Sequence, residues 1–263
     1  MKAGALEPIL RRSRERLLEL PSELELERAA ARAPVPRSLM AELADLGFGV
    51  IAEMKRRSPS AGSLRPDLDV AATAEMFEAA GAVAISVLTE PDSFGGSIED
   101  LRLARQRSRL PILRKDFVIH PLQVVEARAA GADLVLLIVR ALPAATLAEC
   151  LATADELGME ALVEVHDRSD LQLAVAAGAR LIGINNRDLD RLTTDLAVTE
   201  QLAPLVPEDR LVISESGIST PADASRVRAA GANAILVGEA LMRGPDPAMA
   251  IRQLVGIGAR ECG

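Results

Sequence analysis

One four-residue motif, Ala-Ala-Gly-Ala, occurs four times and constrains the fold of this chain more than any other feature. The copies stand at residues 79–82, 129–132, 176–179 and 229–232, and each precedes an apolar or β-branched run. This pattern is typical of a helix that ends at a left-handed glycine and leads into a buried strand. The glycines are about 50 residues apart with one further strand-and-helix unit between each pair, so one unit has about 25 residues.

From Phe48 onward the chain has room for about eight such units, which close naturally into a (βα)8 barrel. A doubly wound open sheet is the main alternative, but it rarely needs eight parallel units, and no GxGxxG follows the first strand. We therefore predict an α/β protein, a single-domain (βα)8 (TIM) barrel, whose strands are Gly49–Glu53, Val83–Leu88, Pro111–Leu113, Leu134–Ile138, Glu160–Glu164, Leu181–Asn185, Arg210–Ser214 and Ala234–Val237.

The residues before the barrel predict a helical N-terminal extension. Helices are expected from Pro8 to Leu20, from Ser22 to Arg32 and, after a Pro-rich break, from a Ser38 cap to Leu46. Ser22 with Glu25 three residues later forms a capping-box pattern. We expect residues 1–47 to cover the barrel and to form one domain with residues 48–263.

Composition excludes several classes of function. The net charge of −8 argues against nucleic acid as a partner, because phosphates require a basic surface. Cys150 and Cys262 are isolated, which predicts free thiols and a reducing, cytoplasmic location. The longest apolar stretch, Leu134 to Val139, is too short to span a membrane. No set of His, Cys and carboxylate residues has metal-ligand spacing, so we expect no metal.

Lysine is scarce in this chain, and its positions are informative. Of 30 basic residues only Lys2, Lys55 and Lys115 are lysines, and the last two stand at strand ends. An ammonium can give up a proton near neutral pH, whereas a guanidinium cannot. A lysine kept where arginine is otherwise preferred therefore indicates a functional ammonium, most of all at Lys115.

Charged and amide side chains gather at the carboxyl ends of the predicted strands, where such barrels place their chemistry. Alternate strands supply most of them. The set consists of Glu53, Lys55, Lys115, Glu164, Asn185 and Glu215. Groups held this close shift one another's pKa values, which suits an ammonium acid beside a carboxylate base. A structural ion-pair network at the barrel rim is the alternative interpretation.

Small residues after the last two strands predict a phosphate site. Ser216-Gly217 and Gly238-Glu239 follow those strands, and the loops there often bind phosphate in this fold. Glu239 suits a phosphate only if its backbone N–H points inward. Of the two histidines, His166 is a rival general base, but the neighbouring Asp167 favours a structural role at a helix start, and His120 is expected in a loop.

An ordered set of motifs resembles the indole-3-glycerol-phosphate synthase family over nearly the whole chain. The motifs are residues 51–60 (Ile-Ala-Glu-Met-Lys-Arg-Arg-Ser-Pro-Ser), 86–90 with 94–96, 113–117, 162–166, 183–189, 214–218 and 236–238. The resemblance implies ring closure, decarboxylation and dehydration of 1-(2-carboxyphenylamino)-1-deoxyribulose 5-phosphate, without a cofactor. This small anionic substrate belongs to tryptophan biosynthesis.

The resemblance also implies roles for individual residues. Lys115 would protonate the carbonyl oxygen and Glu164 would be the base, while Lys55 would pair with the substrate's anionic groups or serve as the second acid. Glu53, Asn185 and Glu215 would orient the lysines and the ribulose hydroxyls. The expected substrate-binding residues are Ser58, Ser216, Gly217, Gly238 and Glu239 for the phosphate, Arg187 as a second anion contact, and Phe94 and Phe117 for the anthranilate ring.

Two other functions remain open from the sequence. One is a phosphoribosylanthranilate isomerase-like barrel, which generally uses a different acid and base pair. The other is a non-catalytic barrel that binds a phosphorylated ligand, although such a protein would be expected to have lost part of the charged set. We expect a monomer or a weak homodimer that binds no nucleic acid and no membrane.

Overall fold

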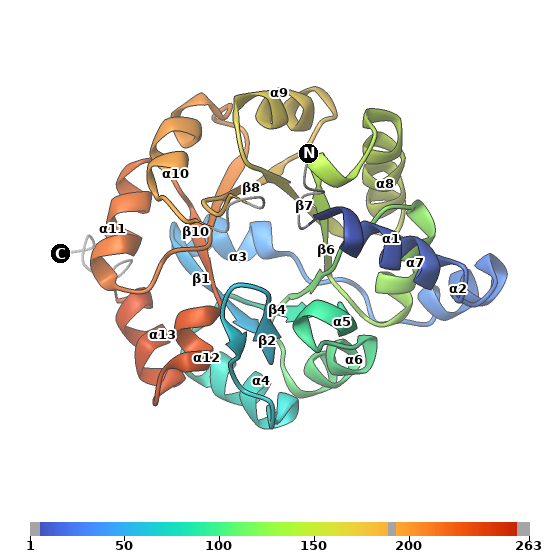
Figure 1. The fold of residues 1–263 in the computed structure, drawn as a ribbon, viewed down its shortest axis with the longest axis horizontal. Coiled ribbons are helices and arrows are strands. Elements are labelled where there is room, and N and C mark those ends of the chain that lie inside the picture. Colours follow the sequence, from blue (N-terminus) through green and yellow to red (C-terminus); the bar gives the residue numbers. More distant parts are fainter. Residues whose placement is uncertain (1–5, 189–192, 257–263) are drawn as a thin grey trace.

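A closed barrel of eight parallel strands forms the centre of the computed structural model, which describes residues 6–188 and 193–256 (Figure 1). The strands pair in the order β1-β10-β9-β8-β7-β6-β5-β4, and β1 closes the ring against β4. Their bounds are β1 Gly49–Met54, β4 Ala84–Leu88, β5 Ile112–Lys115, β6 Leu134–Ile138, β7 Glu160–Val165, β8 Leu181–Asn185, β9 Leu211–Glu215 and β10 Ala234–Val237. The predicted fold class is confirmed.

Helices alternate with the strands and surround them (Figure 1). They are α4 Val70–Ala79, α6 Ile98–Arg107, α7 Pro121–Ala129, α8 Ala144–Glu156, α9 Arg168–Ala176, α10 Ala197–Leu202, α11 Pro221–Ala229 and α13 Pro247–Val255, with short helices α5 Pro91–Phe94, α12 Glu239–Arg243, η1 Val139–Ala141 and η2 Ala203–Leu205. The four repeated glycines follow α4, α7, α9 and α11 with φ between 87° and 111°. They end these helices as the repeat predicted.

Each predicted strand is present with its bounds shifted by at most two residues. The largest shift is at β5, which extends to Lys115 because this residue pairs in register with Leu88 of β4. Lys115 is therefore held within the sheet itself. A position paired with a neighbouring strand is more rigid than one in a loop, which suits a side chain that must point in a fixed direction.

Side chains alternate between the interior of the barrel and the layer under the helices. Val50 and Ala52 of β1 pack outward with the helices, whereas Ile51 packs inside. The same alternation directs Glu53 inward, as it does the last inward residue of β5, β7, β8 and β9. The sheet thus builds an apolar interior that ends in a polar layer at the carboxyl ends of the strands, composed of Glu53, Lys115, Glu164, Asn185 and Glu215.

Three helices precede the barrel, namely α1 Leu6–Leu17, α2 Glu23–Ala30 and α3 Leu39–Leu46. Ser22 and Glu25 form the expected capping box of α2, and Ser38 caps α3. The helix α3 lies across the base of the barrel, where Leu39 and Leu43 join the interior cluster at the amino ends of the strands (Figure 1). The carboxylate of Glu160, the first residue of β7, accepts hydrogen bonds from the backbone of α3.

The helix α1 lies over the opposite end of the barrel, which is the mouth formed by the carboxyl ends of the strands. Its Ser13 donates a hydrogen bond to the backbone oxygen of Phe117 at 2.6 Å, and Arg16 contacts Asp116 at 3.1 Å. The N-terminal extension therefore contacts both ends of the barrel. The grouping of residues 1–47 and 48–263 into one domain stays a prediction, and these contacts are what supports it.

Leu43→Ala should lower the free energy of unfolding by about 2–5 kcal/mol, because it removes a buried side chain from the base of the barrel. Leu46→Ala, on the same helix but 55% exposed, is the matched control and should change it by less than about 1 kcal/mol. Urea denaturation followed by circular dichroism measures both. Equal effects of the two substitutions would show that α3 is not packed as described.

Candidate active site

A cavity of about 500 Å³ opens at the carboxyl ends of the strands, a volume typical of small-molecule sites. All the residues predicted for catalysis or substrate binding line it: Glu53, Lys55, Ser58, Phe94, Lys115, Phe117, Glu164, Asn185, Arg187, Glu215, Ser216, Gly217, Gly238 and Glu239. The structure therefore brings the predicted set together, while the role of each residue stays a prediction.

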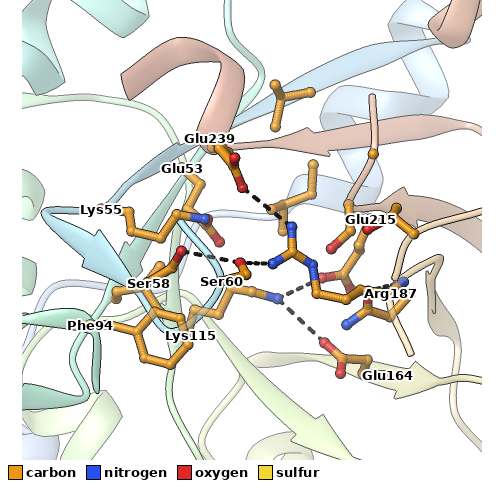
Figure 2. A pocket seen from close by; sticks show the side chains of 18 of the residues that line it. Glu53, Lys55, Ser58, Ser60, Phe94, Lys115, Glu164, Arg187, Glu215 and Glu239 are labelled. Atoms are coloured by element: carbon orange, nitrogen blue, oxygen red, sulfur yellow. Dashed lines mark hydrogen bonds and ion pairs between the residues drawn. The ribbon is translucent and has the colours of Figure 1, made fainter. Parts of the chain in front are cut away.

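The ammonium of Lys115 lies between two buried carboxylates, as Figure 2 shows. Its Nζ is 2.5 Å from Glu215 Oε2 and 3.4 Å from Glu164 Oε2. The second lysine, Lys55, pairs with Glu53 at 2.8 Å. The mouth thus holds two ammonium groups and three carboxylates, and all five side chains are largely shielded from water.

The environment drives the pKa values of the two carboxylates apart. Burial raises the pKa of Glu215 to about 7, and the neighbouring charge of Glu164 adds to the rise against the opposing effect of Lys115. Burial also acts to raise the pKa of Glu164, but Lys115, then His166 and a hydrogen bond from Asn185, bring it below its ordinary value. A site with one ionised carboxylate and one that titrates near neutrality can take and give protons.

Lys115 itself is stabilised as an ammonium. Burial acts to lower its pKa, but the charges of Glu215, Glu164 and Glu53 outweigh burial and raise the pKa above its ordinary value. A buried ammonium without such partners would lose its proton. Three carboxylates therefore ensure that the side chain facing the cavity is an acid.

Two glycines leave the space that these carboxylates fill. A Cβ at Gly183 of β8 would lie 2.2 Å from Glu215 Oε1, and a Cβ at Gly238 would lie 2.2 Å from Glu53 Oε1. Each glycine faces the interior at the level of the charged layer. Any larger residue at either position would displace a carboxylate from its lysine.

The other side of the mouth is built from turns and an arginine. Ser216, with φ 69°, is the one non-glycine residue with a left-handed backbone among those the structure describes, and Gly217 follows with φ 80°. Arg187 reaches across the opening between the Ser60 hydroxyl and the Glu239 carboxylate, which lies 3.3 Å away (Figure 2). Ser216, Gly217 and the Arg187 side chain therefore line the same cavity from neighbouring loops.

The sequence predicted a role only for the backbone of Glu239 and none for its carboxylate. Besides its backbone, which begins the short helix α12, its carboxylate contacts Arg187 and, 3.3 Å away, Arg243 Nε. The Glu239 carboxylate thus places a negative charge of the protein itself beside two guanidinium groups. Spacing along the chain does not reveal this contact, because Arg187 belongs to a different loop.

Two phenylalanine rings line one side of the cavity, and ion pairs hold the segments that carry them in place. The rings of Phe94 and Phe117 lie with centroids 6.3 Å apart. The buried carboxylate of Glu90 accepts hydrogen bonds from the backbone of the α5 turn that carries Phe94, and it also contacts Arg16 of α1 at 3.4 Å. Arg16 therefore links α1 to the turn of Phe94 and to Asp116, the neighbour of Lys115.

Several lining residues were not predicted from the sequence. Leu6 and Ile9 of α1 line the cavity, as do Thr194 and Ser60. Ser60 lies in the hairpin between two short strands, β2 Arg57–Ser58 and β3 Gly62–Ser63. Ser60 stands in a motif that the resemblance includes, and Ile9 belongs to the apolar face of the predicted first helix. Nothing in the sequence indicates which end of the barrel that helix covers.

The structure also shows where His120 and Cys150 lie. His120 is the N-cap of α7, and its Nδ1 accepts from the Leu122 N–H. Cys150 is a buried free thiol, whereas Cys262 lies outside the described residues. Within residues 6–188 and 193–256, no group of three or more His, Cys, Asp or Glu side chains is disposed to hold a metal ion, and no helix is long and apolar enough to cross a membrane.

The raised pKa of Glu215 predicts a pH-dependent stability. The folded protein keeps a proton on Glu215 up to about pH 7, whereas the unfolded chain loses it near 4.5. The stabilising contribution is thus complete below pH 4.5 and is lost as the pH rises to 7. Between these values the free energy of unfolding of the native protein should fall relative to Glu215→Gln, by at most about 1.4 kcal/mol per pH unit.

Urea denaturation at several pH values measures this difference, with the exposed Glu208→Gln as the control that should run parallel to the native protein. A native protein that gains stability over Glu215→Gln as the pH rises from 5 to 7 would contradict the raised pKa.

The family model and the relatives found by sequence agree on one family. The family model described as "Indole-3-glycerol phosphate synthase" matches residues 6–254. An indole-3-glycerol phosphate synthase of Nocardioides sp. is 51% identical over 89% of this chain and 90% of the relative, and one of Parafrankia sp. is 49% identical over 89% and 87%. Among solved structures, 3-hexulose-6-phosphate synthase from Salmonella typhimurium has a TM-score of 0.66 at 14% identity, over 81% of this chain and 99% of that one. That structure supports the barrel fold alone.

Proposed function

The chain belongs to the indole-3-glycerol phosphate synthase family, and on this premise we propose how its barrel mouth performs the family's reaction as a carboxy-lyase. The substrate joins an anthranilate ring to a ribulose phosphate. The ring carbon that bears the carboxylate attacks the C2 carbonyl, carbon dioxide leaves, and loss of water completes the indole.

Lys115 is proposed as the acid of the ring closure. Attack on the carbonyl develops negative charge on its oxygen, and an alkoxide is basic enough to take a proton even from an ammonium of raised pKa. The observation that carries this assignment is the position of Lys115 Nζ, which lines the cavity and is held by Glu215 at 2.5 Å and Glu164 at 3.4 Å.

Glu164 is proposed as the base that removes a proton in the later dehydration step. Its lowered pKa keeps it ionised near neutral pH, as a base requires. Asn185 supports this role, because its amide oxygen accepts the Arg187 N–H and leaves its NH2 group to donate to Glu164. Glu215 orients Lys115 and, with a pKa of about 7, contacts the ribulose hydroxyls as donor or acceptor.

The remaining residues are proposed to bind the two ends of the substrate. Lys55, kept in place by Glu53, pairs with the anthranilate carboxylate before it leaves and supplies the proton for dehydration. The apolar surfaces of Phe94 and Phe117 enclose the ring. On the opposite side, the phosphate is bound by Arg187, the Ser58 hydroxyl and the backbone of Ser216, Gly217, Gly238 and Glu239.

Both alternative functions are less well supported. An isomerase-like barrel does not require the Lys115 and Glu164 pair, and a non-catalytic binding barrel has no need for an ammonium stabilised by three carboxylates. The relatives' names and the family model point to the synthase.

We also propose a cytoplasmic enzyme that is a monomer or a weak homodimer. The buried free thiol of Cys150 suits a reducing compartment. The large exposed apolar side chains of the described residues are spread over different elements, as single exposures usually are on monomers: Leu18, Leu24, Val35, Leu46, Leu173, Leu205 and Met249. Sedimentation velocity at micromolar concentration decides the oligomeric state.

The function is tested by mixing the protein with carboxyphenylamino-deoxyribulose phosphate, without metal or cofactor, and following indole fluorescence. The chain contains no Trp and no Tyr, so the product signal rises from a dark background. We expect a steady rise. A flat trace with folded protein would leave the binding-only barrel or another sugar phosphate as the better explanation.

Lys115→Arg should reduce kcat by about 100-fold or more, because a guanidinium keeps the charge but gives up no proton. The matched control is Lys2→Arg, which makes the same change in the terminal tail and should leave kcat unaltered. Near-native turnover by the Lys115→Arg variant would remove Lys115 as the acid.

A further inference from the structure

His166 lies directly behind the proposed base. It follows β7 two residues after Glu164, and its Nε2 is 3.3 Å from Glu164 Oε1. Lys115 contacts the other oxygen, Oε2, at 3.4 Å. The two oxygens of this carboxylate therefore have different partners. His166 is buried and is not among the described residues that line the cavity, so it reaches the site only through Glu164.

The second ring nitrogen faces another buried carboxylate. His166 Nδ1 is 3.6 Å from Asp170 Oδ2. Asp170 is itself fixed by the backbone N–H of His166 at 3.0 Å and by Arg140 Nε at 2.8 Å. A continuous series of charged and polar groups thus runs from Arg140, which is one third exposed, through Asp170 and His166 to Glu164.

Packing alone does not account for this arrangement. Each ring nitrogen faces a buried carboxylate, Glu164 at 3.3 Å from Nε2 and Asp170 at 3.6 Å from Nδ1. Burying a polar ring between two carboxylates costs free energy, so such an arrangement usually has a functional explanation. An apolar side chain of similar size would fill the same space without that cost.

We propose that His166 is a positioning residue, whose Nε2–H holds Glu164 Oε1 so that Oε2 is presented to Lys115 and to the substrate. The inference rests on the proposed role of Glu164 as the base. Asp170, held by Arg140, sets the orientation of the imidazole ring, as carboxylates do for functional histidines.

The contact also affects the ionisation of the base. The groups that face Glu164 are Lys115 from β5, His166 from β7, Asn185 from β8 and, through Lys115, Glu215 from β9. Those near the imidazole are Glu164 itself, Asp170 from α9 and, behind Asp170, Arg140 from η1. His166 acts in the same direction as Lys115, and both lower the pKa of Glu164.

His166→Leu tests the inference, because it removes both ring nitrogens and keeps a buried side chain of similar volume. We expect kcat to fall by about 10- to 100-fold with KM changed by less than about twofold, since no substrate contact is lost. The acidic limb of kcat/KM should move up by about one pH unit as the base becomes easier to protonate.

Two amide variants show which ring nitrogen of His166 positions Glu164. A glutamine amide reaches the position of Nε2, whereas an asparagine amide reaches only that of Nδ1. His166→Gln should therefore recover most of kcat, and His166→Asn should remain close to His166→Leu. This comparison stands even if His166→Leu does not fold. His120→Asn, which changes the only other histidine and keeps an N-cap, should behave like the native enzyme.

A folded His166→Leu variant with native kcat and a native pH profile would overturn the inference and leave the roles of Lys115 and Glu164 untouched. Equal losses in the Gln and Asn variants with an unmoved acidic limb would also overturn it, because they would mark a purely structural residue. A native enzyme without turnover would instead refute the proposed function.

Discussion

The structure of the mouth depends on one buried ammonium among three carboxylates. Each of these charges would be costly to bury alone, and each is stable because the others are within a few ångströms. This requirement fixes several residues at once. Lys115 lies within β5, and Gly183 and Gly238 lack the side chains that would displace Glu215 and Glu53. The parallel register of the sheet, which pairs Asn185 with Glu215, keeps all of them at one level.

Two chemically different regions share this opening. The carboxyl ends of β1, β5, β7 and β9 carry the buried ammonium and carboxylate groups, whereas the loops after β8, β9 and β10 supply turns and Arg187. Glu239 is the exception in the second region, since its carboxylate shares Arg187 and Arg243. An anionic ligand in this region would therefore compete with a carboxylate of the protein for the two guanidinium groups.

The fold and the charged residues at the strand ends were predictable from the sequence, because both follow from periodicity. Helices that end in glycine repeat along the chain. A charged residue at the last inward-facing position of a strand must lie at the mouth of the barrel. Phe94, Phe117 and Arg187 were expected only from the family resemblance, and Leu6 and Thr194 were not expected at all. Contacts between different loops were not predictable in this way. The pairing of Glu239 with Arg187, and the placement of α1 over the mouth and α3 at the base, depend on packing between distant segments. His166 could have been placed beside Glu164 from its spacing of two, but the adjacent helix cap offered an equally good explanation.

The contacts of the N-terminal helices have a consequence for synthesis on the ribosome. Ser13 bonds to Phe117, and α3 receives its carboxylate partner from Glu160, more than 100 residues later in the chain. The partners of α1 and α2 at Phe117 and α7, and the partner of α3 on β7, are thus translated long after these helices have left the ribosome. Until then their apolar faces have no barrel to pack against and are exposed to chaperones and to aggregation.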